Sequence, residues 1–243
     1  MFLKEFYSSE NDRVLIGADR ASRFAKEVAG DFNPLHDADA KRFCVPGDLL
    51  FSLVLEKFGL SRNMEFTFSG MVGRDILLNF PETDATAFDI RDDNGKAYLL
   101  VERSGETSFD ESLIESFIRS YVAYSGPNFP KVLVPLMASH NVMINTDRPL
   151  VIYESMSFAL ERLDFSVPVL EPSETTLAVN GRRGEALLHF SVKAGGETVG
   201  RGFKKLVISG IREYDKPAID AFVENYLARM ESYRARVQEW ASR

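Results

Sequence analysis

The sequence predicts an α+β fold built from one unit of roughly 100 residues that occurs twice in tandem. Each half of the 243-residue chain begins with segments of helical periodicity and continues with short segments typical of β-strands. Apolar residues make up 45% of the chain and aromatic residues 12%, which is enough for a well-filled core. Asp93-Asn94-Gly95, a strong hairpin signal, joins two of the expected strands.

The first unit is expected to span residues 1–107. Apolar residues at helical spacing predict a short helix over residues 19–29, which stops at Gly30. Residues 49–58 are apolar on almost every face, so they predict a buried helix. Short β-type segments follow, at about residues 65–69, 75–80, 85–91 and 97–105.

The second unit, residues 108–212, repeats this order. An amphipathic helix is expected over residues 112–123, and a second, mostly apolar helix over residues 135–144. Strands are then expected near residues 150–154, 156–165, 175–180, 186–193 and 198–209. The repeat is also local, because Gly30-Asp31-Phe32-Asn33-Pro34 corresponds in position to Gly126-Pro127-Asn128-Phe129-Pro130.

A third segment, residues 213–243, is predicted to form one long amphipathic helix. Its apolar residues recur at intervals of three and four from Ile219 to Trp240. Asp215 is the expected N-cap, and Pro217 lies in the first turn, where its missing N–H costs nothing. We expect this helix to pack on the body of the protein or on a partner chain.

Composition narrows the class of function. A net charge of -7 without a basic, aromatic-rich face argues against a nucleic-acid partner. The apolar runs are far shorter than the roughly 20 residues of a spanning helix, so no membrane partner is expected. The single cysteine, Cys44, leaves neither a disulfide framework nor thiolate ligands for a structural zinc ion. We therefore expect a cytoplasmic protein without metal or redox cofactor.

Asp31 and His36 are the candidate catalytic residues. They are five residues apart across a turn set by Asn33 and Pro34, which can bring a carboxylate and an imidazole to one point. Such a pair can take a proton from water and return one to a carbon atom near neutral pH. Ordinary turn chemistry is the alternative, in which Asp31 only satisfies backbone donors.

The stretch Gly30-Asp31-Phe32-Asn33-Pro34-Leu35-His36 resembles the motif of MaoC-like, (R)-specific enoyl-CoA hydratases. That resemblance implies a hotdog fold, here in its double form, with a long central helix in a curved antiparallel sheet. It implies Asp31 and His36 as the catalytic pair, Asn33 in a supporting position, and Gly47 as donor of an oxyanion-binding N–H. Ser52, one turn inside the buried helix, would contact substrate or bond back to its own backbone.

Two features depart from the family pattern. Pro46 and Asp48 flank Gly47, where the family has a histidine and an apolar residue. In the second unit, Pro127 takes the Asp position and Val132 the His position, so that unit is expected to be inert and to form a wall of the site.

Other candidate residues receive no catalytic role. His140 is interpreted as a core residue of the second buried helix, and His189 as a strand residue without metal ligands nearby. Arg201, Lys204 and Lys205 could meet coenzyme A phosphates, but a solvated strand face is the favoured interpretation.

The leading hypothesis is a hydratase or dehydratase of enoyl or 3-hydroxyacyl thioesters of coenzyme A or acyl carrier protein. A non-catalytic thioester- or lipid-binding hotdog and a hotdog thioesterase are the alternatives. A monomeric pseudo-dimer and a homodimer are both compatible with the internal repeat.

Overall fold

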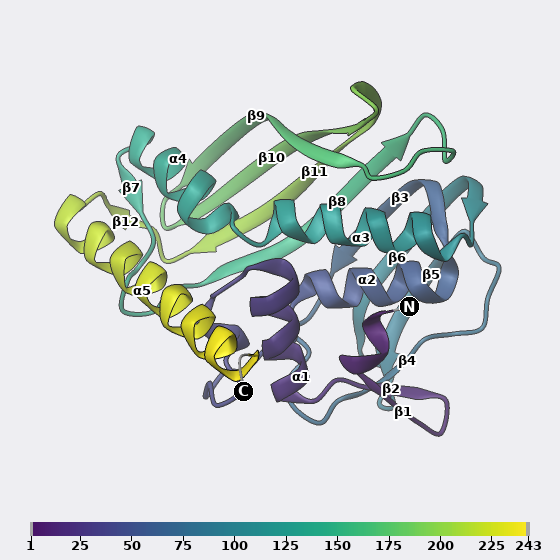
Figure 1. Cartoon of the computed structure of the whole chain (residues 1–243). Helices are drawn as coiled ribbons and strands as arrows, with labels where there is room; N and C mark the ends of the chain where they lie inside the picture. Colours follow the sequence, from purple (N-terminus) through teal and green to yellow (C-terminus); the bar gives the residue numbers. More distant parts are fainter. Residues whose placement is uncertain (1, 242–243) are drawn as a thin grey trace.

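The computed structural model describes residues 2–241 and has a mixed α/β fold with a large antiparallel sheet (Figure 1). In these residues the sheet has ten strands in the order β1-β2-β4-β5-β6-β3-β8-β11-β10-β9, and β12 and β7 form a separate pair. The strands of the first half are β1 (Ser8–Glu10), β2 (Arg13–Leu15), β3 (Leu60–Phe68), β4 (Leu77–Asn79), β5 (Ala87–Asp92) and β6 (Ala97–Ser108). Those of the second half are β7 (Val142–Met143), β8 (Val151–Leu160), β9 (Val169–Asn180), β10 (Arg183–Ala194), β11 (Glu197–Ser209) and β12 (Arg212–Glu213).

The sheet repeats its topology about its centre. From the centre outward, the first half has the order β3-β6-β5-β4 and the second half has β8-β11-β10-β9. In each of these sets of four, the first strand in sequence is central and the second is farthest from the centre. In the first half, β2 and β1 extend the sheet beyond β4. The halves join where β3 pairs antiparallel with β8, with Asn63 opposite Ala159 and Thr67 opposite Ser155. The four strands expected in the first half are present as β3 to β6, including the Asp93-Asn94-Gly95 hairpin between β5 and β6. In the second half, the two strands expected at residues 150–154 and 156–165 form the single strand β8.

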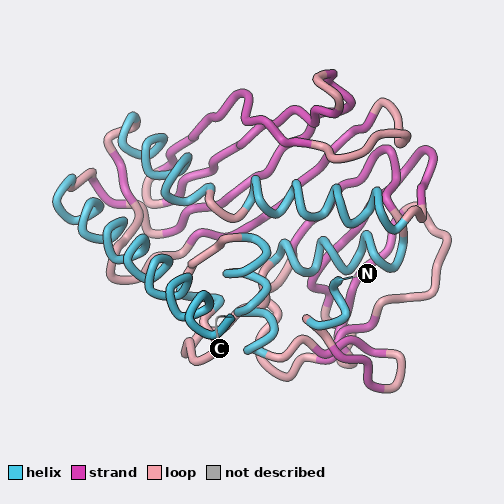
Figure 2. The backbone as a smooth tube through the Cα atoms, viewed as in Figure 1, coloured by secondary structure: helices cyan, strands magenta, loops and turns pink. Residues whose placement is uncertain are grey.

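Two helices lie side by side against the curved sheet (Figures 1 and 2). They are α2 (Gly47–Phe58) and α3 (Glu111–Ser125). As its apolar composition predicts, α2 is buried on nearly every face. The backbone N–H of Leu113 donates to the Asp110 carboxylate at 2.7 Å, which caps the start of α3. Phe51 of α2 packs on Tyr121 of α3 with ring centroids 4.5 Å apart, so the two helices share one core.

The expected second buried helix is wrong in extent and position. α4 covers only Val134–Ser139, and α3 takes the place beside α2. Asn141 adopts a left-handed conformation with φ of 55°, after which the chain enters β7. His140 is therefore exposed at the end of α4, where its Nδ1 lies 2.9 Å from the Leu136 carbonyl, and it is not a core residue.

The other helical segments lie before, between and after these elements in the chain. They are η1 (Phe2–Glu5), α1 (Ala18–Arg23), the π-helix η2 (Phe24–Ala29), the short turn η3 (Pro34–His36), the π-helix η4 (Phe129–Leu133) and α5 (Lys216–Ala241). α5 packs on the same chain, as Figure 1 shows. The Phe32 N–H donates to the Tyr226 hydroxyl at 2.9 Å, and the Tyr233 hydroxyl donates to Glu27 at 2.7 Å. Among the described helices, none is long and apolar enough to cross a membrane.

The two halves make a close contact at Gly126, just past the end of α3. A Cβ atom at Gly126 would lie 1.8 Å from the Ala29 carbonyl oxygen and 3.2 Å from the Asp31 nitrogen. Only a residue without a side chain allows this approach. The two segments that correspond in the sequence repeat, one beginning at Gly30 and the other at Gly126, therefore meet in space.

Gly126→Ala should lower the free energy of unfolding by at least about 2 kcal/mol, because the new methyl group would overlap backbone atoms that cannot rotate away. Urea denaturation followed by circular dichroism measures this change. Gly17→Ala is the matched control, since a Cβ there meets nothing within 4 Å. Equal stability of the two variants would contradict the close contact.

Candidate active site

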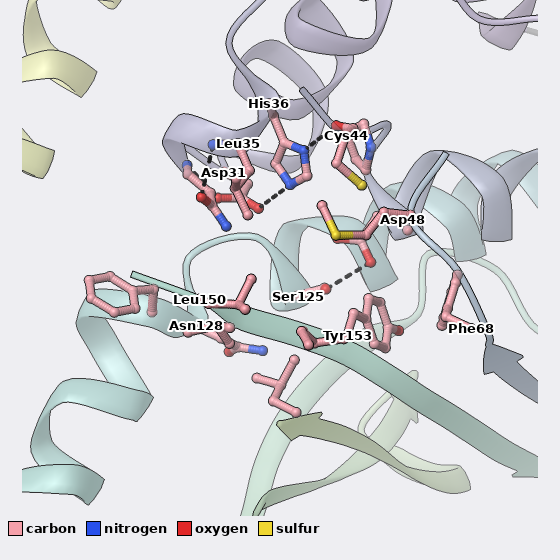
Figure 3. Close-up of a pocket in the computed structure, with 18 of the residues that line it drawn as sticks. Asp31, Leu35, His36, Cys44, Asp48, Phe68, Ser125, Asn128, Leu150 and Tyr153 are labelled. Atoms are coloured by element: carbon pink, nitrogen blue, oxygen red, sulfur yellow. Dashed lines mark hydrogen bonds and ion pairs between the residues drawn. The ribbon is translucent and has the colours of Figure 1, made fainter. Parts of the chain in front are cut away.

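A cavity of about 330 Å³ opens between the two halves of the chain (Figure 3). Asp31 and His36 lie on one wall, and residues of the second half form the opposite wall. Most of the lining is apolar: Leu35, Val45, Leu50, Phe68, Met71, Val72, Leu133, Ile144, Leu150, Val151, Leu206 and Phe222. The cavity therefore suits an apolar ligand with a few polar atoms, and its size is at the lower end of the range for small-molecule sites.

Asp31 is held at the end of the helical segment α1–η2. Its backbone N–H donates to the Ala25 carbonyl at 2.7 Å, and its Oδ1 accepts from the Asn33 N–H at 2.8 Å. These bonds leave Oδ2 facing His36. The turn chemistry expected from the sequence is thus present, and it orients the carboxylate toward the cavity.

His36 is fixed by the short turn η3. Asn33 Oδ1 accepts from the Leu35 N–H at 3.1 Å and so begins that turn. The His36 ring donates from Nδ1 to the Cys44 carbonyl at 2.7 Å, because a carbonyl oxygen can only accept. Nε2 then lies 3.5 Å from Asp31 Oδ2.

This arrangement favours an ion pair of charged Asp31 with protonated His36. Burial by itself lowers the pKa of His36, but the hydrogen bond and negative charge of Asp31 outweigh it, so the pKa is raised. Burial likewise opposes ionisation of Asp31, yet the hydrogen bond and charge of His36 bring the pKa of Asp31 below its usual value. The side chains of Asp31 and His36 are 23% and 12% exposed, and both residues line the cavity.

Gly47 is the first residue of α2 and lines the same cavity. N–H groups in the first turn of an α-helix have no carbonyl partner within the helix, so they are available to an oxygen atom of a ligand. A Cβ at Gly47 would lie 2.9 Å from Tyr153 and 3.2 Å from Phe68. These two rings explain why a glycine stands here.

Asp48 points into the cavity and belongs to a buried polar chain that spans both halves. The Ser125 hydroxyl donates to Asp48 Oδ1 at 2.9 Å, and Lys204 Nζ donates to the Ser125 hydroxyl. The Lys204 ammonium also lies over the Tyr153 ring, 4.1 Å from its centroid. Burial raises the pKa of Asp48, and the charge of Lys204 opposes that rise.

Sequence reasoning missed Lys204 as a cavity residue. It is only 6% exposed, whereas its neighbour Lys205 forms surface ion pairs with Glu154 and Glu185. Alternation along β11 turns Lys204 and Lys205 to opposite faces of the sheet. This alternation could have indicated that Lys204 and Lys205 lie on opposite faces of the sheet. The sequence did not show which of the two lysines faces inward.

Asn128 is a second missed residue, and its side-chain nitrogen is unusual. The residue lines the cavity, is 5% exposed, and its Nδ2 has no hydrogen-bond partner among the described residues. Leaving a buried donor unpaired costs about 1–3 kcal/mol. In the sequence repeat Asn128 corresponds to Phe32, so its position gave no hint of a role.

The other expected residues differ in placement. Asn33 lines the cavity, with its side-chain oxygen used in the turn. Ser52 does not line the cavity, because its hydroxyl donates to the Asp48 carbonyl at 2.6 Å within α2, so only the second of its two expected roles is present. His189 lies on β10 beside Phe203, away from the cavity lining. Among the described residues, no three His, Cys, Asp or Glu side chains gather as a metal site would require.

The C-terminal helix α5 contributes Phe222 and Tyr226 to the cavity wall. Tyr226 accepts the N–H of Phe32, the residue next to Asp31. Arg229 of the same helix pairs with Asp37, just past His36. The helix therefore holds both sides of the motif turn, although its sequence pattern showed only that one face was apolar.

This chain belongs to the family described as a protein of unknown function, DUF3581, whose model matches residues 1–217. That match ends within the first turn of α5. None of the curated proteins matches the chain.

Several solved structures resemble the chain at low identity. An acyl-CoA thioesterase II, TesB2, from Mycobacterium marinum is 10% identical, with 89% of this chain and 99% of that chain covered and a TM-score of 0.43. A MaoC-like dehydratase is also 10% identical, with 84% and 98% covered and a TM-score of 0.42. A 12:0-ACP thioesterase from Umbellularia californica is 13% identical, with 65% and 76% covered and a TM-score of 0.28. The function proposed below rests on the geometry of the site and not on these likenesses.

Asp31→Asn should lower the pKa of His36 below its ordinary value of about 6.5, because burial then acts without the opposing carboxylate. In the unsubstituted protein the same pKa should lie above that value. Titration of the His36 ring by NMR measures its pKa in the variant and in the unsubstituted protein. The asparagine retains an Oδ1 acceptor for the Asn33 N–H, so the turn is preserved.

The same pair predicts a pH window for stability. The pKa of Asp31 is lowered in the folded protein, so its contribution to the free energy of unfolding is lost as the pH falls through that folded pKa. The pKa of His36 is raised, so its contribution is lost as the pH rises through its folded pKa. The stability deficit of Asp31→Asn should thus be largest between about pH 4 and 6.5 and shrink at alkaline pH. A deficit that grows steadily toward pH 9 would contradict the ion pair.

Lys204→Met should lower the free energy of unfolding by about 3 kcal/mol at pH 7, because it leaves the Asp48 carboxylate buried without its cation. The deficit should increase as the pH rises through the raised folded-state pKa of Asp48, because below it the carboxyl is protonated in both folded proteins. Adding Asp48→Asn should recover part of it, since the amide oxygen can still accept from Ser125. Lys205→Met, which removes only surface ion pairs, is the control and should change stability by less than about 1 kcal/mol.

Proposed function

We propose that this protein is a double hotdog that adds water to a trans-2-enoyl thioester or, in reverse, dehydrates a 3-hydroxyacyl thioester. Its units would be residues 1–107 and 108–212, followed by the C-terminal helix of residues 213–243. The observation that carries the proposal is the Asp31–His36 ion pair on the wall of a largely apolar cavity between the halves. The pair could activate water beside the double bond of an enoyl thioester, while the apolar part of the cavity would hold the acyl chain.

The pair can carry both proton transfers of hydration. The Asp31 carboxylate takes a proton from water while the water oxygen bonds to C3 of the enoyl group. His36 Nε2–H then gives its proton to C2, which leaves Asp31 protonated and His36 neutral. Transfer of the proton from Asp31 to His36 across their contact restores the ion pair.

The thioester oxygen gains negative charge during this addition and needs hydrogen-bond donors. The N–H of Gly47 at the start of α2 meets that need by position, and the helix dipole has its positive end there. Asp48 alone would oppose the developing charge. Lys204, linked to it through Ser125, offsets that opposition.

The second unit would be a wall and not a second active centre. Pro127 and Val132 stand at the positions of Asp31 and His36 in the repeat, and neither can transfer a proton. The same unit supplies Ser125, Asn128 and Lys204 to the cavity. One chain thereby contains two complementary halves of a single site, so the proposal requires no partner subunit, and a homodimer remains compatible with it.

The expected substrate is an acyl thioester of coenzyme A or acyl carrier protein. Incubation with crotonyl-CoA tests the proposal if loss of the conjugated double bond and release of free thiol are followed in parallel. Bond loss without thiol release is expected. It should fall by about 100-fold or more in Asp31→Asn and in His36→Ala, because each variant removes one proton-transfer group.

His140→Ala is the matched control, since this histidine is exposed and lies outside the cavity lining. It should retain full activity. Thiol release without bond loss would replace the hydratase by a thioesterase, in which Asp31 directs water at the carbonyl carbon. Saturable binding without either reaction would leave a thioester-binding protein.

A further inference from the structure

The Asn128 side chain offers a donor to the cavity that the protein itself does not use. Its Nδ2 is buried and has no partner among the described residues, although nearly all buried polar groups of proteins are paired. Figure 3 shows the Asn128 side chain on the wall opposite Asp31 and His36, and the residue lines the cavity. A group of this kind suits an acceptor atom that arrives with a ligand.

A local structural role does not account for this asparagine. Asn128 occupies the N-cap position of η4, where an asparagine ordinarily accepts a backbone N–H with its side chain. Here the side chain makes no capping hydrogen bond. The next two residues, Phe129 and Pro130, continue the helical segment without that help.

The backbone brings Asn128 close to the proposed reaction centre. Gly126, two residues earlier, is in contact with Ala29 and with the Asp31 nitrogen. Consecutive Cα atoms are about 3.8 Å apart, so Asn128 can lie no more than about two residue lengths from that contact. Asn128 and Asp31 line one cavity from opposite halves.

We infer that the Asn128 amide donates a hydrogen bond to the thioester carbonyl oxygen of the bound substrate, together with the N–H of Gly47. This inference rests on the proposed function and names a further catalytic residue for it. A carbonyl oxygen can accept two hydrogen bonds, one for each of its lone pairs. An asparagine amide is neutral, so it stabilises the developing charge without competing with Asp31 for the proton of His36.

Binding of two matched ligands tests the inference without any turnover. Butyryl-CoA has the thioester carbonyl, whereas S-butyl-CoA is a thioether without it. The unsubstituted full chain should bind butyryl-CoA at least about tenfold more tightly by isothermal titration calorimetry, because two net hydrogen bonds favour the ligand with the carbonyl. In Asn128→Leu this ratio should fall about fivefold, the effect of one net hydrogen bond, while the Gly47 N–H still favours the carbonyl.

Two further variants separate a ligand contact from a structural effect. Asn128→Asp replaces the donor by an acceptor of the same shape and should reverse the preference. Asn145→Leu is the control, because buried Asn145 accepts the Asp147 N–H at 3.1 Å within its own loop and does not line the cavity. It should reduce stability and leave the ratio unchanged. Asn128→Leu should melt at or above the temperature of the unsubstituted protein, because it removes an unpaired donor.

In the hydration assay, Asn128→Leu should reduce kcat about 100-fold and raise KM only about fivefold, because the donor acts more strongly on the developing charge than on the ground-state carbonyl. An unchanged ligand ratio in both Asn128 variants would overturn the inference and leave the proposed hydratase standing. Failure of the unsubstituted protein to bind either ligand would overturn both.

Discussion

A buried chain of polar side chains, Asp48–Ser125–Lys204, holds the two halves of the protein together at the cavity. The carboxylate comes from the first turn of α2, the hydroxyl from the last residue of α3 and the ammonium from β11. Removing two charges from water is costly, and their attraction repays the cost only if the remaining bonds are made. The serine and the Tyr153 ring supply those contacts. The Asp48–Ser125–Lys204 contacts fix the first turn of α2 and therefore the position of Gly47 at the cavity.

The two halves share an arrangement of strands but differ in the side chains that they present to the cavity. The sheet of the second half keeps the strand order of the first half, and its Gly126 segment meets the Gly30 segment in space. Pro127 and Val132 stand where the first half has Asp31 and His36. The second half also brings to the cavity the Lys204 ammonium and the Asn128 amide, whose nitrogen has no partner among the described residues. One chain can thus present two differently lined walls to a single cavity, because the halves differ in sequence at corresponding positions.

Periodicity and turn chemistry predicted much of the fold because they depend on near neighbours. α2 is buried as its apolar faces require, and the Asp93-Asn94-Gly95 hairpin joins β5 to β6. The motif turn is also local, so the orientation of Asp31 and His36 follows from Asn33 and Cys44 nearby. Periodicity alone could not find the end of α4, where Asn141 turns left-handed and leaves His140 exposed.

The sequence by itself determined the α+β order, the tandem repeat and the candidate pair in the first unit, since each is encoded within a short window of residues. Only the tertiary structure decided that α3 lies beside α2, that α5 closes the cavity, and that Asp48, Lys204 and Asn128 face it. These facts involve residues 70 to 200 positions apart. Such contacts depend on how whole faces pack and on which buried charges find partners, and neither can be read from spacing along the chain.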